Sequence, residues 1–323
     1  MTQRPIVVSG SLAFDRIADF PGRFAREIRP DKLHVLSVSF VVPTMREHFG
    51  GTAGNIAYNF SLLGERPLVI ASVGKDFQAY RAWLLRHHVA LALRTISTAQ
   101  TATAMMITDQ DDNQIAAFHP GALATPAWTA VRRGPQPSLV IAAPGNKEDF
   151  LQLCRWARSH DIPWVVDPGQ IIPLFSTKEL REVIDGCFLL IANDYEMSTI
   201  QKRSGLSAAA LEKKARHVVT TLGSRGSVIQ SGNKKYTVPA AKPKNTSDPT
   251  GAGDAFRAGL LTGLRLGLPL ATAGRLASVV SCYTVEQYGT QTHRFTLAQL
   301  AARYRRSFGT SFMKEKGHVD YAL

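Results

Sequence analysis

The sequence is poor in several features that define other classes of protein. It holds only three cysteines among 323 residues, Cys154, Cys187 and Cys282, which are scattered and odd in number. This excludes a disulfide framework and is typical of a reducing compartment, and no spacing of Cys and His matches a zinc site. No apolar run is long enough to cross a bilayer, and the residues before Ile6 lack the layout of a signal peptide. We therefore expect a cytoplasmic protein without a membrane partner.

Acidic residues are also in the minority. The chain has 38 Lys and Arg against 25 Asp and Glu, which gives a formal net charge of +13. Nucleic-acid-binding proteins show such an excess, but here the basic residues are spread along the chain. The one modest cluster, Arg303, Arg305 and Arg306, has the spacing of the solvated face of a helix. We expect no nucleic-acid partner, because a basic enzyme that handles polyanionic nucleotides is the simpler interpretation.

Two common phosphate-binding signatures are missing. The sequence has no Gly-x-x-x-x-Gly-Lys-[Ser/Thr] run and no protein-kinase catalytic loop. It has instead the run Asp-Pro-Thr-Gly-Ala-Gly-Asp at 248–254, followed by an apolar helical pattern. A tight glycine turn before a helix N-terminus favours an anion, usually phosphate. Asp254 would repel that phosphate unless it served to take a proton from an attacking hydroxyl, so the run indicates phosphoryl transfer to an alcohol.

Apolar β-branched runs alternate with helical patterns along most of the chain. This rhythm predicts an α/β fold with a central, mostly parallel sheet and helices on both faces. The runs that we expect to be strands are 6–8, 68–73, 139–143, 164–166, 188–191 and 217–221. The patterns that we expect to be helices are 52–63, 80–85 and 150–159.

Two segments break this rhythm, at about 12–48 and 101–118. The first contains a strand-like stretch, Leu33 to Phe40, with no helix after it. The second has two apolar runs, 103–108 and 114–118, around a polar turn, which is a hairpin pattern. We expect these strands to form a small sheet outside the main one, placed as a lid on a single domain that spans 1–323.

Polar residues at strand ends are the candidates for ligand contacts, because doubly wound sheets bind ligands beyond the carboxyl ends of their strands. Gly50, Gly51 and Asn55 belong to a second glycine-rich helix start, where an amide can bind a hydroxyl; an ordinary capped turn also fits. Asp15 follows the first strand and could accept hydrogen bonds from two vicinal hydroxyls, or be an exposed loop residue. His119 fits a turn residue or a ligand contact.

Two further motifs have open interpretations from the residues alone. Asn193 and Glu196 are three residues apart and share a helix face, so Glu196 could hold Mg²⁺ directly or through water; ordinary N-capping by Asn193 is the alternative. The stretch Thr221 to Gly226 lies between two strands and fits either a nucleotide-binding loop or a plain hairpin turn.

These motifs together resemble the ribokinase-like (PfkB) family of carbohydrate kinases. The stretch 49–57 is similar to the family's N-terminal signature and 248–256 to its C-terminal one, while Asn193-x-x-Glu196 and Thr221-x-Gly223-x-x-Gly226 are similar to two shorter motifs. The four occur in the family's order across nearly the whole chain. The resemblance implies a three-layer α/β/α sandwich with a small β-strand lid.

The resemblance also implies roles for individual residues. Asp254 would be the general base, and the amides of Gly251, Ala252 and Gly253 would form the anion hole for the transferred phosphoryl group. The residues that would bind the substrate are Asp15, Gly50, Gly51, Asn55, Phe118 and His119. Those that would bind ATP are Asn193, Glu196, Thr221, Gly223 and Gly226, with Mg²⁺ held at Glu196 through water and K⁺ at Asp248 and Thr250.

Within the family, the chain is most similar to bacterial adenosine and nucleoside kinases, on the lid segment from Phe20 to Phe40 and the stretch 114–122. This implies transfer from ATP to the 5′-hydroxyl of a ribonucleoside, with adenosine the first expectation. Four aromatic or sulfur side chains could line a slot for the base or form only the lid's own core: Phe14, Phe40, Met106 and Phe118. Alternatives are a kinase of a free sugar or sugar phosphate and a non-catalytic nucleotide-binding regulator. Both a monomer and a homodimer fit.

Overall fold

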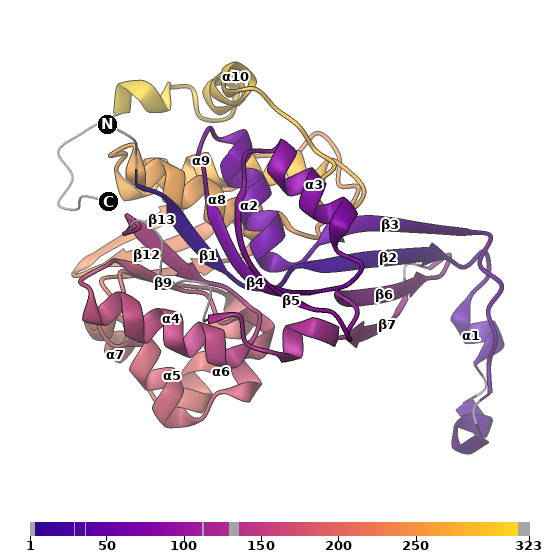
Figure 1. The fold of residues 1–323 in the computed structure, drawn as a ribbon. Helices are drawn as coiled ribbons and strands as arrows, with labels where there is room; N and C mark the ends of the chain where they lie inside the picture. Colours follow the sequence, from indigo (N-terminus) through magenta and orange to yellow (C-terminus); the bar gives the residue numbers. More distant parts are fainter. Residues whose placement is uncertain (1–3, 29, 36, 112, 129–135, 316–323) are drawn as a thin grey trace.

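A nine-stranded sheet forms the centre of the molecule in the computed structural model, which describes residues 4–28, 30–35, 37–111, 113–128 and 136–315 (Figure 1). Its order is β13-β12-β11-β10-β9-β8-β1-β4-β5. All neighbours from β11 to β5 are parallel, and the only antiparallel pairings are those of β12 with β11 and with β13 at one edge. The predicted mostly parallel sheet is therefore confirmed. Its strands are β1 (Ile6–Ser9), β4 (Leu68–Gly74), β5 (Ala90–Ile96), β8 (Leu139–Ala142), β9 (Trp164–Val166), β10 (Leu189–Asn193), β11 (His217–Thr221), β12 (Ser227–Ser231) and β13 (Lys234–Val238).

Helices cover both faces of this sheet and form two separate apolar cores (Figure 1). Strand β1 shows the division, because Ile6 and Val8 point into one core and Val7 into the other. The first core contains α2 (Thr52–Leu62), α3 (Gln78–Arg86), α8 (Ala252–Arg265), α9 (Leu270–Val285) and α10 (Leu297–Phe308). The second contains α4 (Lys147–Ser159), α5 (Thr177–Ile184), α6 (Asp194–Ser204) and α7 (Ala208–Lys214). Helix α4 begins three residues before the predicted start, because the Asn146 side chain caps it.

A second, four-stranded sheet has the order β3-β2-β6-β7 and extends to one side of the main sheet (Figure 1). Its strands are β2 (Ala13–Asp19), β3 (Thr44–Gly50), β6 (Ala102–Thr108) and β7 (Gln114–His119). The antiparallel pair β6–β7 is the hairpin that the sequence predicted. Short 3₁₀ turns complete the chain at η1 (Pro30–Val35), η2 (Gly121–Ala124), η4 (Gly169–Leu174), η5 (Gly223–Arg225) and η6 (Phe312–Glu315).

Between β2 and β3 the chain forms an arm, residues 20–43, that projects from the smaller sheet and contains α1 (Phe24–Glu27) (Figure 1). The strand expected over 33–40 is wrong, because η1 occupies 30–35 and no described residue of 37–43 is in a strand. The edge of β2 is taken instead by β3, in the register Ala13 to Gly50. Phe40 packs against Phe20 and Phe24 at ring distances of 4.8 and 5.1 Å, so its ring joins a small aromatic cluster within the arm, whereas Val35 and Val41 are exposed.

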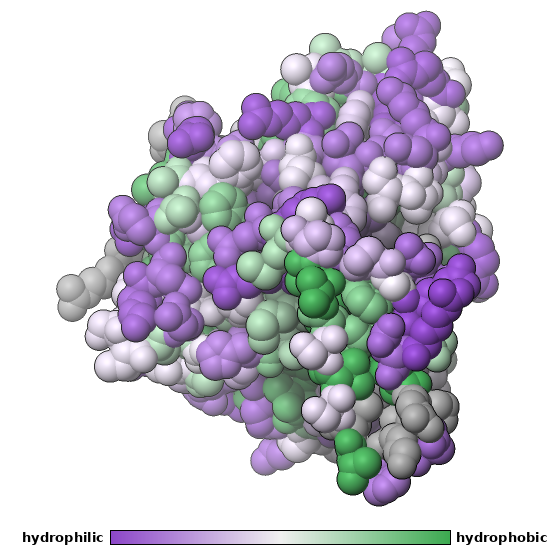
Figure 2. Space-filling model, turned by 90° about the vertical axis from the view of Figure 1, so that its right-hand side faces the viewer, coloured by the Kyte–Doolittle hydropathy of each residue, from purple (hydrophilic) through white to green (hydrophobic). Residues whose placement is uncertain are grey.

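Figure 2 shows the molecule from the side of the smaller sheet and the arm, where apolar side chains gather in a band bordered by hydrophilic ones. The exposed large apolar residues of these two parts are Val35, Val41, Met45, Met105, Ile115 and Phe118. Among the described residues, no helix combines the length and the apolar character needed to span a membrane.

Candidate active site

The first turn of α8 lies where the smaller sheet meets the main one. Gly251 precedes the helix with a φ of +78°, a left-handed conformation that glycine adopts without strain. The two carboxylate oxygens of Asp248 accept from the N–H groups of Thr250 and Gly289, at 2.8 and 3.0 Å, and so tie this turn to the segment after α9. The N–H of Ala252 donates to the Pro249 carbonyl at 3.1 Å. Of the three amides expected to face an anion, the N–H of Ala252 is therefore used for a hydrogen bond within the turn instead of facing a ligand.

Asp254 is held from the other end of the chain. The amide Nδ2 of Asn55 donates to its Oδ2 at 2.9 Å. Burial raises the pKa of Asp254 to about 7, against the opposing effects of the nearby Arg257 guanidinium and the Asn55 hydrogen bond. A carboxylate with a pKa close to neutrality is well suited to accept a proton during catalysis.

A second buried carboxylate lies near Asp254. Burial raises the pKa of Asp15 to about 6, and a hydrogen bond of 3.1 Å from the Thr290 hydroxyl opposes that effect. Thr290 also donates to the Phe49 carbonyl at 2.8 Å. A Cβ at Gly50 would lie 2.1 Å from the Asp15 carboxylate, so glycine at 50 makes room for that carboxylate rather than contacting a ligand itself.

Two cavities meet at Asp254. The first has a volume of about 760 Å³ and the second of about 360 Å³. Asp254, Gly251, Thr52, Pro144 and Gln170 line both of them. A group bound in one cavity can therefore face a group bound in the other across the same carboxylate, as a transfer reaction between two substrates requires.

The first cavity combines a polar end with apolar walls. Asp15, Gly51 and Asn55 line it together with Asp254, and Phe118 reaches it from the smaller sheet. Asp15 pairs in register with Ala104, and Ala104 with Phe118, so these three side chains form one row across the face of that sheet. The apolar remainder of the lining comes from Ala13, Pro120, Leu123, Ala124, Ile171 and Leu174.

His119 is separated from the other expected substrate residues. As the neighbour of Phe118 on β7 it points to the opposite face, where it lines a different cavity of about 260 Å³ with Arg16 and Met105. Of the four candidates for a base slot, Phe14 is buried against Phe49 and Tyr80, and Phe40 belongs to the arm. Met106 lies on the same face of β6 as the cavity-lining Ala104 but does not itself line the cavity, so Phe118 is the candidate of the four whose side chain does.

The second cavity contains four of the five residues expected to bind ATP: Asn193, Glu196, Thr221 and Gly223. Gly226 does not line it. Its φ is +90°, and a Cβ there would lie 2.1 Å from the Val238 carbonyl, so glycine at 226 is required by the turn into β12. Asn193 and Glu196 form a reciprocal capping box at the start of α6, in which Glu196 Oε2 accepts from the Asn193 N–H at 2.9 Å.

The charges around the second cavity bear on the metal expected there. Among the described residues, Asp167, Glu196 and Asp254 line it with one cationic side chain, Arg257. This excess of carboxylates would repel a nucleotide triphosphate, and a divalent cation would offset the repulsion. Glu196 Oε1 is free of the capping box and offers the hard oxygen that Mg²⁺ prefers, and the described residues include no group of three or more acidic, His or Cys side chains able to enclose a metal. The residues present fit Mg²⁺ that keeps most of its waters.

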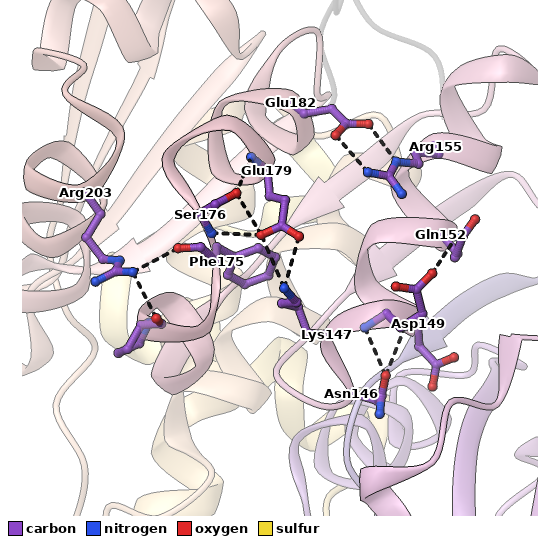
Figure 3. A network of polar contacts seen from close by, with 12 residues as sticks. Asn146, Lys147, Asp149, Gln152, Arg155, Phe175, Ser176, Glu179, Glu182 and Arg203 are labelled. Carbon is purple, nitrogen blue, oxygen red and sulfur yellow. Dashed lines mark hydrogen bonds and ion pairs between the residues drawn. The ribbon is translucent and has the colours of Figure 1, made fainter.

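One wall of the first cavity is fixed by a polar network at the start of α4 (Figure 3). Asn146 caps α4 and donates from Nδ2 to the Leu123 carbonyl at 3.0 Å, which holds η2 against the helix. Lys147, which also lines the cavity, forms an ion pair with Glu179 at 3.0 Å. Hydrogen bonds from Ser176 and Lys147 lower the pKa of Glu179 to about 2, so this carboxylate stays charged at neutral pH.

Sequence reasoning missed several residues that hold the site together. Arg257 is buried on α8 and pairs with Asp167 at the end of β9. Gln291 donates to Asn55 Oδ1 at 3.1 Å and to the Tyr80 hydroxyl at 2.6 Å, and so orients the amide that reaches Asp254. Gln291 has a φ of +58°, which is uncommon outside glycine. The signal available in the sequence was an arginine within an apolar helix; nothing in it marked Gln291.

The chain was compared with protein families and with known proteins. The model of the pfkB family of carbohydrate kinases matches residues 23–296. The nucleoside kinase of Methanothermobacter thermautotrophicus is 31% identical over 316 residues, which cover 95% of this chain and 97% of that protein. The ribokinase of Bacillus subtilis is 27% identical, with coverage of 75% and 83%.

Solved structures give the same result. The Burkholderia thailandensis nucleoside kinase in complex with inosine superposes with a TM-score of 0.83 at 34% identity, covering 95% of this chain and 99% of that one. The Methanocaldococcus jannaschii nucleoside kinase, an archaeal member of the ribokinase family, superposes with a TM-score of 0.85 at 27% identity, covering 94% and 99%.

Proposed function

This chain belongs to the pfkB family of carbohydrate kinases, and from that premise we propose that it transfers the γ-phosphoryl group of ATP to the 5′-hydroxyl of a ribonucleoside, with adenosine among its acceptors. The observation that carries the proposal is the meeting of two cavities at Asp254. The nucleoside occupies the first cavity and ATP the second. The expected three-layer α/β/α architecture is that of the family, and the smaller sheet serves as the lid.

The size and lining of the first cavity support a nucleoside over a free pentose. At about 760 Å³ it lies in the range that encloses a drug-sized ligand, whereas a pentose would fill a small part of it. Asp15 and Asn55 at its polar end suit the ribose hydroxyls. The apolar wall formed by Phe118, Leu123 and Ile171 suits a planar base.

A sugar phosphate is disfavoured, because its phosphate would need free cations. Among the residues that the structure describes, Lys147 is the one cationic side chain that lines the first cavity, and it is paired with Glu179. Arg16 is bound to Glu47 at 2.9 Å, and Arg23 lies 3.3 Å from Asp111, both on the smaller sheet and its arm. None of them supports binding of a second phosphate group in this cavity.

The transfer reaction follows from these positions. The Asp254 carboxylate accepts the proton of the 5′-hydroxyl while the oxygen forms a bond to the γ-phosphorus. The bond from that phosphorus to the bridging oxygen breaks, and ADP leaves. The amides of Gly251 and Gly253 at the start of α8 stabilise the charge on the transferred group. When bound, Mg²⁺ at Glu196 supplies charge neutralisation to the phosphate oxygens. A K⁺ ion at Asp248 and Thr250 would reinforce the turn that carries these amides.

The test is a panel of acceptors assayed with ATP and Mg²⁺, with and without K⁺. Adenosine, inosine, guanosine, cytidine and uridine stand against ribose, fructose and fructose 6-phosphate, and ADP formation is followed for each. We expect adenosine to be phosphorylated, and we expect kcat/KM for at least one nucleoside to exceed that for ribose at least a hundredfold. Turnover of ribose without turnover of any nucleoside would replace the proposal by a ribokinase activity, which the Bacillus subtilis relative makes the second candidate. ATP binding without turnover of any acceptor would indicate a regulator.

A further inference from the structure

Arg257 is a charged residue in an apolar setting. It lies three residues after Asp254 on α8, so the two share one face of the helix. Its other neighbours along the helix are apolar or small, and its own side chain is 10% exposed. Burying a guanidinium there without a partner would be strongly unfavourable. The site must therefore use or offset this charge.

Asp167 offsets part of it. The Nε and Nη2 atoms of Arg257 donate to the two carboxylate oxygens of Asp167, the second at 2.5 Å, which is a bidentate pair. Asp167 itself is 1% exposed and lies just beyond the end of β9. The pair fixes the plane of the guanidinium, since neither partner can rotate without losing both hydrogen bonds.

The third nitrogen, Nη1, is directed elsewhere. It has no hydrogen-bond partner among the described residues, and it lies 2.7 Å from the position that a Cβ would occupy at Gly253. Arg257, Gly253 and Asp254 all line the second cavity. The guanidinium therefore lies directly against the amide turn where an anion is expected, with one N–H group unused. Glycine at 253 is needed for this approach as well as for that of the ligand.

We propose that Arg257, oriented by Asp167, donates a hydrogen bond from Nη1 to an equatorial oxygen of the phosphoryl group while that group passes from ATP to the acceptor hydroxyl that faces Asp254. In the transfer, the new bond forms between the acceptor oxygen and phosphorus, the bond to the leaving ADP breaks, and the proton goes to Asp254; Arg257 neither gives nor takes a proton. It supplies a fixed positive charge at the place where negative charge accumulates. The inference rests on the kinase activity of the family and deepens the proposed function.

The competing explanation is that the pair only fastens β9 to α8. A double variant separates the two, because replacing both partners of a buried ion pair by apolar residues of similar size leaves no unpaired charge. Arg257→Met with Asp167→Leu should fold with a melting temperature near that of the wild type. Arg265 and Glu65, a buried pair at the far end of the same helix at 3.5 Å, provide the matched control as Arg265→Met with Glu65→Gln.

The experiment measures kcat and KM for ATP and acceptor in both double variants and in Arg257→Lys, with whichever acceptor the wild type uses. We expect kcat of the Arg257/Asp167 double variant to fall at least a hundredfold, with nucleoside binding unchanged in the absence of ATP. The Lys variant should retain more activity than the double variant, because it keeps the charge. The control pair should keep its kcat.

A folded Arg257/Asp167 double variant with a kcat within threefold of the wild type would overturn the inference. Equal losses in the two double variants would also overturn it, since both changes would then act through helix packing. If the double variant fails to fold, the Lys variant decides on its own: wild-type KM for the acceptor with a kcat reduced at least tenfold supports a role at the phosphoryl group. A wild type that phosphorylates ribose and no nucleoside refutes the acceptor proposal but leaves this test intact with ribose.

Discussion

Asp254 should destabilise the folded protein at neutral pH, so its removal should make the protein inactive and more stable at once. Its pKa is about 7 in the folded state, against an ordinary value of 3.8 that applies to the unfolded chain. Because the folded pKa is raised, the folded state holds the proton more tightly than the unfolded state between these values. The free energy of unfolding should therefore decrease as the pH rises from about 4 to about 7, because Asp254 must then ionise in its buried site.

The size of this effect follows from the shift. A displacement of roughly three pK units corresponds to about 4 kcal/mol in the free energy of unfolding at pH 8, as an upper bound for a group that is partly exposed. Asn at 254 carries no charge at any pH and can still bond to Asn55. The free-energy difference between Asp254→Asn and the wild type should therefore grow by about 1.4 kcal/mol per pH unit up to neutrality and level off above it.

Urea denaturation from pH 3 to 8.5 measures this difference, and a coupled ADP assay measures kcat. Glu182→Gln is the control of opposite sign. Hydrogen bonds and charge from Arg155 lower the pKa of Glu182, so its loss should destabilise the protein at neutral pH, and the deficit should shrink as the pH falls below about 4.5. A difference for Asp254→Asn that stays constant across the range would refute the argument from burial. Near-wild-type turnover of the same variant would refute its role as the base.

Three other changes test separate parts of the site. Gly253→Ala should fold, since the φ of residue 253 lies outside the left-handed region, but the new Cβ would meet Arg257 Nη1 at 2.7 Å. We therefore expect kcat to fall about a hundredfold while the melting temperature changes little. An unchanged kcat would show that the guanidinium can move away freely. Gln291→Leu removes the donor to Asn55 and leaves buried polar partners unsatisfied, so urea denaturation should show a free energy of unfolding lower by about 2–4 kcal/mol. A decrease below about 0.5 kcal/mol, the scale of a neutral surface change, would contradict this expectation. Phe118→Ala should raise KM for the nucleoside about tenfold or more whereas His119→Ala on the opposite face should not, and equal effects would mean that the row across the smaller sheet does not define the base site.

Much of the fold could be predicted because its signals are local. The β-branched runs of the parallel strands and the turn at Gly251 are encoded by residues adjacent in the sequence. Leu33 to Phe40 misled the prediction, because a short apolar stretch whose Phe40 packs in an aromatic cluster with Phe20 and Phe24 has the same composition as a strand. Periodicity in so short a run does not distinguish the two.

The site was predictable only in part. The family resemblance implied that Gly51, Asn55 and Asp254 belong to one site, and all three line the first cavity. The separation of Phe118 from His119 follows from the alternation of side chains along β7, but the expected strand ended at 118, so the sequence did not show that His119 belongs to it. The pairing of Arg257 with Asp167 joins residues 90 positions apart, and a single sequence carries no signal for such a contact.

The hydrogen bonds at Asp254 and Asp15 join residues 199 and 275 positions apart. A ribosome that has made the first two hundred residues has therefore produced most of the lining of the first cavity without Asp254, which we propose as the general base. The site around Asp15 and Asp254 is complete only after Thr290 and Gln291 have been synthesised and have packed against residues near the start of the chain. Such distant closures are slow to form, so nascent and truncated chains should neither phosphorylate an acceptor nor hydrolyse ATP wastefully. The order of synthesis itself thus delays activity until the fold is nearly finished.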